Sequence, residues 1–304
     1  MSEPKFRSPL NFARMLKIYR LTGSMSLAFH FLRNGSVKPA LHYLEKGGKF
    51  IFEQGRWIAK YGHQSILVDR LHGKQFHILE HLDPIEFSGW NISYALSGEI
   101  TIQYDDRKIQ FDSYDGIINM VEFFSEYECL FVKGKTVIDI GAYRGESPLY
   151  FLLKGAQKVL AIEPNKEHFS IASERIMKNG FSDKIDIRNV GLGNEVHEFD
   201  SQSGGLEAGP LWSMEDFQKW IAGNKDKDCD LVMKIDCEGC EYVLYKKPEF
   251  VSEWKNLGLK EFVMEYHEGD VLTLVKNWSS NGFYVYRIVQ KSHDCGIIHG
   301  ILRD

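Results

Sequence analysis

The segment that most constrains this chain is residues 137–145, V-I-D-I-G-A-Y-R-G, where a short apolar run ends in an acidic residue and breaks into glycine. A second apolar run follows and ends at Glu163 and Pro164. A strand, a glycine turn, a helix and a second strand produce this layout, with a carboxylate near the tip of each strand. Such a unit binds an adenosine-containing cofactor at the carboxyl edge of a parallel sheet.

The turn favours S-adenosylmethionine over a nicotinamide dinucleotide. A dinucleotide brings a pyrophosphate, and its usual G-x-G-x-x-G turn lets backbone N–H groups close on two phosphates. Here the middle glycine is missing, and the acidic residue at the entrance of the turn would repel phosphate. S-adenosylmethionine has no phosphate and carries an ammonium and a sulfonium, which a carboxylate attracts. The cofactor-binding residues predicted in this turn are Asp139, Gly141, Ala142, Tyr143 and Gly145.

The next three strand ends complete the predicted cofactor site. Glu163 stands where a carboxylate can accept hydrogen bonds from both ribose hydroxyls, which suits either cofactor, and Pro164 and Asn165 follow it. The third strand ends at Asn189, Val190 and Gly191, which we expect to border the adenine. Asp236, at the end of the fourth strand, is also predicted to contact the cofactor. The alternative is a parallel strand pair of some other α/β protein, because apolar runs alone are common.

A second motif, K-I-D-C-E-G-C-E, occupies residues 234–241, and a later apolar run ends in E-Y-H at residues 265–267. With the glycine turn and G-L-G-N at 191–194, these segments resemble the FkbM family of S-adenosylmethionine-dependent methyltransferases. The family pattern is approximately D-x-G-A-N-x-G, E-P-x, K-I-D-x-E-G-x-E and an E-x-H-like strand end. The resemblance runs from about residue 123 to the C-terminus. Here Tyr143 replaces an asparagine, Arg144 an apolar residue, and Cys237 and Cys240 small apolar residues.

The alternation of strands and helices predicts a doubly wound, Rossmann-like α/β sheet over residues 126–304, mostly parallel with an antiparallel last strand. The expected strands are 137–141, 159–163, 185–190, 231–236 and 261–266, with 283–289 and 296–302 as an antiparallel edge. The expected helices are 146–154, 166–179, 213–222, 240–246 and 270–281. Residues 201–210 have a flexible composition and form either a loop over the site or an ordinary surface connection.

The pattern of residues 1–125 predicts a smaller region that contains helices and β-strands. Short apolar runs separated by turn residues predict a small antiparallel sheet from strands near 49–52, 57–59, 65–68, 93–96, 99–104 and 108–111. Residues 121–130 look helical and lead into the large sheet.

The N-terminal arm, residues 1–35, is basic and amphipathic. The first fifty residues hold nine lysines and arginines against two acidic residues, although the whole chain has a net charge of −5. Phe12, Met15, Leu16 and Tyr19 follow the spacing of one helix face. A basic amphipathic helix can lie on an anionic membrane surface or meet an anionic partner. The alternative, which we favour, is packing on the main domain or on another subunit.

The remaining sequence signals point to a cytoplasmic protein. We find no run of about 18 apolar residues for a membrane span and no signal peptide. Five cysteines is an odd count, which predicts reduced thiols. Cys237 and Cys240 form a C-x-x-C, and packing is the favoured interpretation because no second cysteine or histidine pair lies at metal-binding spacing.

The tips of the fourth and fifth strands carry the predicted catalytic residues, which are Lys234, Asp236, Glu238 and His267, with Glu265 beside them. Asp236 or His267 would take the proton of an alcohol acceptor. Lys234 would stabilise an oxyanion or bind an acidic acceptor; alternatively, it only pairs with a neighbouring carboxylate, and Glu241 faces solvent. Three acids and a histidine can also hold a divalent cation. Ligand geometry cannot be read from sequence, so no metal ligand is assigned.

The resemblance implies O-methylation of a hydroxyl on a sugar, a polyketide or another small molecule, so a small-molecule or glycan acceptor is the expected partner. Nucleic acid is disfavoured, because the main domain is acidic and the fourth strand ends in K-I-D-C rather than N-P-P-Y. Two rivals are an NAD-dependent enzyme and a non-catalytic S-adenosylmethionine-binding scaffold that works through its basic arm at a membrane surface.

Overall fold

The computed structural model describes residues 9–33, 37–53, 55–61, 64–67, 90–94, 99–111, 126–193, 209–226, 229–237, 239–241, 249–267, 270–291 and 295–303. The chain divides into two compact units, Met1–Val121 and Glu122–Asp304. None of the described helices is long and apolar enough to cross a membrane.

In its described residues, the N-terminal unit contains three helices and two small sheets. The helices are α1 (Pro9–Thr22), α2 (Met25–Arg33) and α3 (Val37–Glu45). One antiparallel sheet contains β1 (Lys49–Glu53), β2 (Arg56–Tyr61) and β3 (Gln64–Leu67), and the other contains β4 (Trp90–Tyr94), β5 (Ile100–Tyr104) and β6 (Arg107–Phe111). The expected strands are therefore present but form two sheets instead of one. Helix α3 was not predicted; its Pro39 lies in the first turn, where proline is tolerated.

Helix α1 buries an apolar face that differs slightly from the predicted one. Met15 and Ile18 are buried, whereas Tyr19, which was predicted on that face, is 40% exposed. Helix α1 packs against α2 and α3 of the same unit. Met15 and Ile18 are therefore already covered by protein and are not open to a membrane surface.

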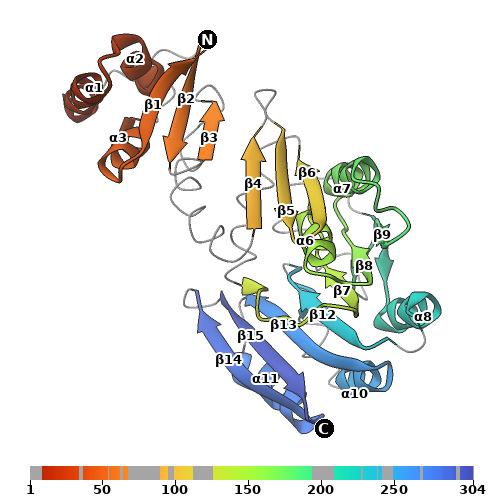
Figure 1. Ribbon diagram of the computed structural model, residues 1–304. Helices are drawn as coiled ribbons and strands as arrows, with labels where there is room; N and C mark the ends of the chain where they lie inside the picture. The colour runs from red at the N-terminus through yellow and green to blue at the C-terminus, as the bar shows by residue number, and fades with distance from the viewer. Residues whose placement is uncertain are drawn as a thin grey trace. The chain divides into compact units, whose positions relative to one another are not determined.

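The C-terminal unit is built on a seven-stranded sheet with the strand order β14-β15-β13-β12-β7-β8-β9 (Figure 1). Its strands are β7 (Thr136–Ile140), β8 (Lys158–Ile162), β9 (Ile185–Arg188), β12 (Leu231–Ile235), β13 (Leu259–His267), β14 (Phe283–Gln290) and β15 (Cys295–Leu302). The strands β13, β12, β7, β8 and β9 pair with their neighbours in parallel. Strand β15 runs antiparallel to both β13 and β14. The doubly wound α/β prediction is confirmed, including the antiparallel last strand.

The last two strands form the antiparallel edge of the sheet, as expected. The last strand, β15, lies between β13 and β14, an order that the sequence did not indicate. Strand β14 at the edge runs in the same direction as β13, since both are antiparallel to β15.

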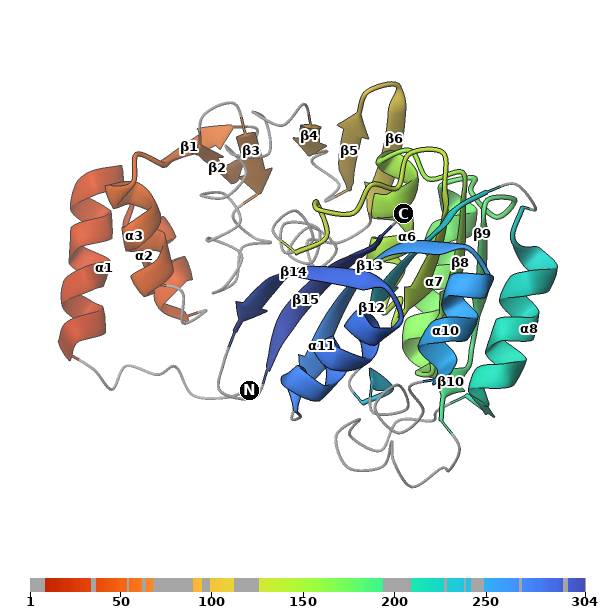
Figure 2. The same ribbon diagram turned by 90° about the horizontal axis from the view of Figure 1, so that it is seen from below.

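Helices cover both faces of the sheet. Strand side chains alternate between the faces. One set, which includes Ile138 and Met233, joins a buried cluster with Phe217, Trp254 and Trp278. These three aromatic residues come from α8 (Met214–Asn224), α10 (Glu249–Asn256) and α11 (Val271–Ser280), which lie side by side in Figure 2. Helix α6 (Glu146–Leu153) contacts β7 and β8, and α7 (Lys166–Lys178) contacts β9.

Three of the predicted segments in or at the start of the C-terminal unit lie partly outside the described residues. Helix α10 was not predicted, and the expected helix 240–246 lies mostly outside the described residues. The stretch 201–210 is described only from Gly209 onward, where β11 (Leu211–Trp212) pairs in parallel with β10 (Gly191–Leu192). Of the expected helix 121–130, only residues 126–130 are described, and they are mainly turn.

The strand order reverses between β7 and β12. The chain moves outward from β7 through β8 to β9 and then returns to β12 on the other side of β7. In open α/β sheets, ligands bind in the crevice at the carboxyl ends of strands where the order reverses. The predicted site residues follow the ends of β7, β8, β12 and β13, so the fold gathers them at this edge.

Candidate active site

The turn after β7 requires both of its glycines. Gly141 and Gly145 each have a φ of +87°, in the left-handed region that glycine tolerates best. A Cβ atom on Gly141 would lie 1.7 Å from the carbonyl oxygen of Asp236, and one on Gly145 would lie 3.0 Å from Cα of Ala172. The first glycine lets the turn pack on the loop after β12, and the second lets α7 approach the start of α6.

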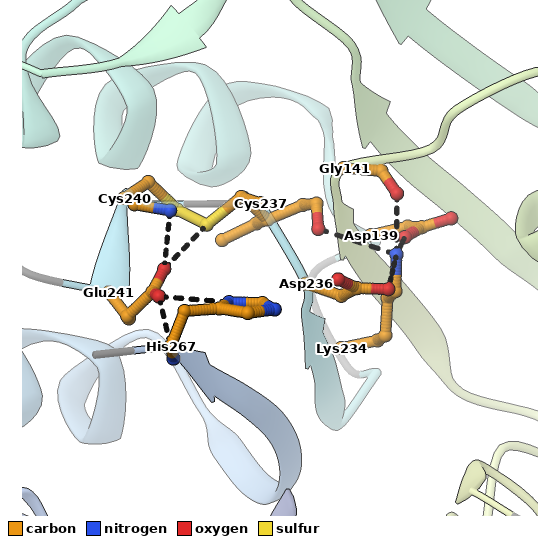
Figure 3. The surroundings of a disulfide bond; sticks show 10 residues. Asp139, Gly141, Lys234, Asp236, Cys237, Cys240, Glu241 and His267 are labelled. Carbon is orange, nitrogen blue, oxygen red and sulfur yellow. Dashed lines mark hydrogen bonds and ion pairs between the residues drawn. A yellow bond between two sulfur atoms is a disulfide. The ribbon is translucent and has the colours of Figure 1, made fainter. Parts of the chain in front are cut away.

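A buried ion pair lies beneath this turn. Nζ of Lys234 is 3.1 Å from Oδ1 of Asp139, and Oδ2 of Asp139 accepts a hydrogen bond from Oγ of Ser147 at 2.6 Å. The same ammonium donates to the carbonyl oxygen of Gly141 at 2.5 Å (Figure 3). Lys234 therefore ties the end of β12 to the end of β7 and to the turn.

Both members of this ion pair are buried: Lys234 is 1% exposed and Asp139 is fully buried. Burial raises the pKa of Asp139, and the positive charge of Lys234 opposes that rise. Burial alone lowers the pKa of Lys234, but Asp139 and Asp236 together raise it above its ordinary value. The ion pair supports the turn, and the cofactor role of Asp139 and the catalytic role of Lys234 stay predictions.

Glu163 is held at the carboxyl end of β8 by two backbone N–H groups. Its Oε2 accepts from Tyr143 N at 2.8 Å, and its Oε1 accepts from Asn165 N at 2.8 Å. Burial raises the pKa of Glu163 to about 7, although these hydrogen bonds favour the charged form. Each carboxylate oxygen has a second lone pair, so Glu163 keeps accepting capacity for ligand hydroxyls.

The other predicted cofactor residues lie around this carboxylate. Ala142 is buried, and Tyr143 is partly exposed with its ring against His168. Asn165 caps α7 by accepting from His168 N at 3.0 Å. The segment that carries Val190 and Gly191 approaches Pro164, because the amide of Asn189 donates to the carbonyl oxygens of Glu163 and Pro164. Asn189 belongs to the third strand tip, which was predicted to border the adenine; its hydrogen bonds to the segment after β8 were not predicted.

Asp236 faces the other side of the turn. Its side chain is 27% exposed and lies 3.7 Å from Nζ of Lys234. Tyr127 donates its hydroxyl to Oδ2 of Asp236 at 2.8 Å. The Tyr127 side chain is buried, and both burial and the charge of Asp236 raise its pKa well above 10, so Tyr127 stays a donor. Tyr127 was not predicted, because it lies 109 positions from Asp236 in the chain and no motif links the two.

His267 is positioned by Glu241. Nδ1 of His267 lies 3.2 Å from Oε1 of Glu241, which also accepts from the backbone N–H of His267 at 3.1 Å. The other oxygen of Glu241 accepts from Gly239 N at 2.9 Å (Figure 3). Glu241 is fully buried, so the alternative in which it faces solvent is wrong. Glu238, the remaining predicted catalytic residue, lies outside the described residues.

The predicted reduced state of the C-x-x-C is also wrong, because Cys237 and Cys240 form a disulfide. The physical reason is proximity: a three-residue separation in this loop brings the two Cα atoms to 5.6 Å, within the usual range for a disulfide. The packing interpretation holds in part, since Cys240 belongs to the buried cluster of the sheet and Cys237 packs against it.

A family model described as O-methyltransferase matches residues 123–203. The matched segment contains β7, the glycine turn, α6, β8 and Glu163, which is the cofactor half of the candidate site. The match supports an S-adenosylmethionine-dependent methyltransferase. The resemblance to the FkbM family in particular remains a prediction.

Two solved structures illustrate the similarity. The O-methyltransferase from Bacillus cereus in complex with SAH is 13% identical, with a TM-score of 0.37 over 56% of this chain and 74% of that one. The fibrillarin from Aeropyrum pernix with natively bound S-adenosyl-L-methionine is 8% identical, with a TM-score of 0.41 over 69% of this chain and 98% of that one. At these scores, the argument for the fold rests on the strand order itself.

One relative is similar in sequence over most of its own length. It is the protein named Uncharacterized protein 158B of Sulfolobus islandicus rod-shaped virus 1, and it is 30% identical over 167 residues. Those residues make up 55% of this chain and 76% of the viral protein. The chain therefore belongs to the same family as this viral protein.

Proposed function

We propose that the protein transfers the methyl group of S-adenosylmethionine to a hydroxyl group of a small molecule or a glycan. The observation that carries this proposal is the carboxylate of Glu163, fixed at the edge where the strand order reverses and within the segment that matches the O-methyltransferase model. A carboxylate in this position accepts hydrogen bonds from ribose hydroxyls. The match to the O-methyltransferase model favours a methyl donor over NAD as the bearer of that ribose.

The residues around Glu163 fit an adenosine-containing methyl donor. Gly141 has no Cβ atom, which lets the turn after β7 approach the carbonyl oxygen of Asp236 and brings the ends of β7 and β12 together. Val190 and Gly191 would border the adenine, and Pro164 and Asn165 would flank the ribose. When bound, the cofactor supplies a methyl group on a sulfonium, and most of the catalysis comes from holding the acceptor in line with it.

The acceptor would lie beside Asp236. A hydroxyl group must lose its proton during methyl transfer, so a base within hydrogen-bonding distance helps. Asp236 is partly exposed, and its Oδ2 is engaged by Tyr127. Its other oxygen is the group we assign to the acceptor hydroxyl. His267 is the rival base, held in place through Glu241.

Calorimetric titration with S-adenosylhomocysteine tests the cofactor half of the proposal. We expect binding by the full chain, no comparable binding of NAD, and at least about tenfold weaker binding by Glu163→Gln, because hydrogen bonds to a charged group are lost. Glu167→Gln is the matched control, because Glu167 is exposed in the first turn of α7. Equal affinity of both variants for S-adenosylhomocysteine, or binding of NAD alone, would contradict the assignment of Glu163 to the cofactor site.

Methyl transfer to a panel of hydroxyl compounds tests the acceptor half. Once a compound that accepts the methyl group has been identified, Asp236→Asn should lower kcat for that compound by about a hundredfold or more, as loss of a general base does. His267→Gln should lower it much less. The reverse order would make His267 the base, and transfer to amines alone would rule out O-methylation.

A further inference from the structure

Glu265, His267 and Cys295 meet at the carboxyl end of β13. Glu265 and His267 are two residues apart on this strand and therefore project from the same face. Cys295 begins β15 and is the register partner of His267. Sγ of Cys295 lies 3.2 Å from Oε1 of Glu265, and Nε2 of His267 lies 3.7 Å from the same oxygen. A sulfur, a nitrogen and an oxygen of these residues all lie within 4.8 Å of one another.

His267 is already oriented as a metal-binding histidine would be. Nδ1 of His267 faces the buried carboxylate of Glu241, which Gly239 also fixes through its backbone N–H (Figure 3). Histidines that bind metals usually donate their other ring N–H to a carboxylate, and this bond selects the tautomer and raises the basicity of the metal-binding nitrogen. Donation from Nδ1 to Glu241 leaves the lone pair of Nε2 on the side of Glu265.

Among the residues that the structure describes, negative charges outnumber positive ones around the cluster. Lys291 pairs with Glu126 at 2.5 Å and with Glu265 at 2.9 Å, and it supplies one positive charge against the carboxylates of Glu126, Glu241 and Glu265. Burial raises the pKa of Glu126, and the nearby charges of Glu265 and Asp236 raise it further. A carboxylate has about four lone-pair sites, so Glu265 can keep Lys291 and still bind a cation.

We propose that Glu265, His267 and Cys295 bind a zinc ion. One thiolate, one imidazole and one carboxylate are the ligand types that zinc takes, at about 2.0–2.3 Å. Cys295 binds as the thiolate, and the proton of its thiol leaves to solvent. Three protein ligands leave a fourth position for water. Zinc binding at this cluster does not depend on methyl transfer, so this proposal can be tested independently of the proposed function.

The experiment is a titration of the metal-free full chain, without reductant, with Zn²⁺ by calorimetry and with Co²⁺ by absorption. We expect one equivalent of each, with the thiolate-to-cobalt charge-transfer band that a cysteine ligand produces. The band should vanish in Cys295→Ser. Zinc affinity should fall at least about tenfold in Glu241→Gln, which removes the support of His267, and further in Glu265→Gln. Cys229→Ser is the control and should bind as the wild type does, because Cys229 precedes β12 and hydrogen-bonds near β7.

A second set of ligand atoms, from Cys237, Cys240 and Glu241, also lies within 4.8 Å, so the titration must separate the two clusters. The double variant Cys237→Ser/Cys240→Ser should still bind one zinc ion with unchanged affinity. Loss of binding in this variant with retention in Cys295→Ser would overturn the proposal, as would a wild type that binds no zinc. If Cys295→Ser does not fold, Glu265→Gln decides the question, since it removes a ligand without changing the strand pairing.

Discussion

Nζ of Lys234 lies 3.1 Å from Oδ1 of Asp139, and neither side chain is more than 1% exposed. Removal of one partner leaves the other as an uncompensated charge in the core. We therefore expect Lys234→Met to lower the free energy of unfolding by about 3–5 kcal/mol, as the loss of one member of a buried pair does. Urea denaturation at neutral pH measures the change.

Lys219→Met is the control for this experiment. Lys219 pairs with Glu215 one helical turn away on α8, and both side chains are largely exposed, so we expect no measurable change. A double variant Asp139→Leu/Lys234→Met should be less destabilised than the sum of its single variants, since it leaves no lone charge. Additive effects would show that the two groups do not interact.

The glycine turn gives a second prediction. Gly141→Ala would place a methyl group 1.7 Å from the carbonyl oxygen of Asp236, so the turn must open or the chain must fail to fold. Gly180→Ala is a matched control with a positive φ and nothing within 4 Å, and it should cost only about 1–2 kcal/mol. Similar thermal midpoints for the two variants would mean that Gly141 does not pack against the loop after β12.

The pKa of Glu163 predicts a pH dependence. The carboxyl has an ordinary value of 4.5 and a folded-state value of about 7. Between these values the folded state keeps a proton that the unfolded state releases, so the contribution of Glu163 to stability falls as the pH rises from 4.5 to 7 and is constant above that. The difference in unfolding free energy between the wild type and Glu163→Gln should follow this course. A difference that does not vary with pH would contradict the raised pKa.

The same titration should appear in ligand binding. The ionised carboxylate accepts hydrogen bonds from ribose hydroxyls more strongly than the protonated one. Affinity for S-adenosylhomocysteine should therefore rise as the pH passes about 7, and Glu163→Gln should lose this dependence. A dependence that persists in the variant would assign it to another group.

The disulfide gives a prediction about stability. Cys237 and Cys240 are three positions apart, and closing so short a loop restricts the unfolded chain only modestly, by about 2 kcal/mol. We expect Cys237→Ala/Cys240→Ala, or the wild type under reducing conditions, to lose about that much in urea denaturation. Cys229→Ala should behave as the wild type under both conditions. A wild type unaffected by reductant would show that the bond does not contribute.

Most of the large sheet could be predicted from sequence because its central strands are buried on both faces. Residues 137–140 and 231–235 are continuous apolar runs interrupted only by Asp139 and Lys234, and all of them are buried. The position of β15 could not be predicted, because its local pattern is the same whether it pairs with one neighbour or two. Helix α10 is a short amphipathic segment that was missed although Pro248 precedes it and Glu249 begins it, both of which are signals of a helix start.

Part of the candidate site could likewise be predicted from the sequence, and part could not. Glu163 and Asp236 could be placed because they follow strand ends, and strand ends share an edge. The pairing of Lys234 with a carboxylate was one of the two sequence interpretations, since a lysine inside a buried strand needs a charged partner. Its nearer partner, Asp139 on the neighbouring strand, was not predicted. Tyr127 and Cys295 could not be placed, because tertiary folding alone brings them to Asp236 and Glu265.

The position of β15 between β13 and β14 also determines when the edge of the sheet can form during translation. Strand β14 leaves the ribosome before β15, yet within the seven-stranded sheet it is hydrogen-bonded only to β15. Strand β13 therefore has an open edge, and β14 has no partner in this sheet, until β15 has been translated and inserted between them. A nascent chain at that stage is exposed to edge-to-edge association. The insertion of β15 also brings Cys295 beside His267.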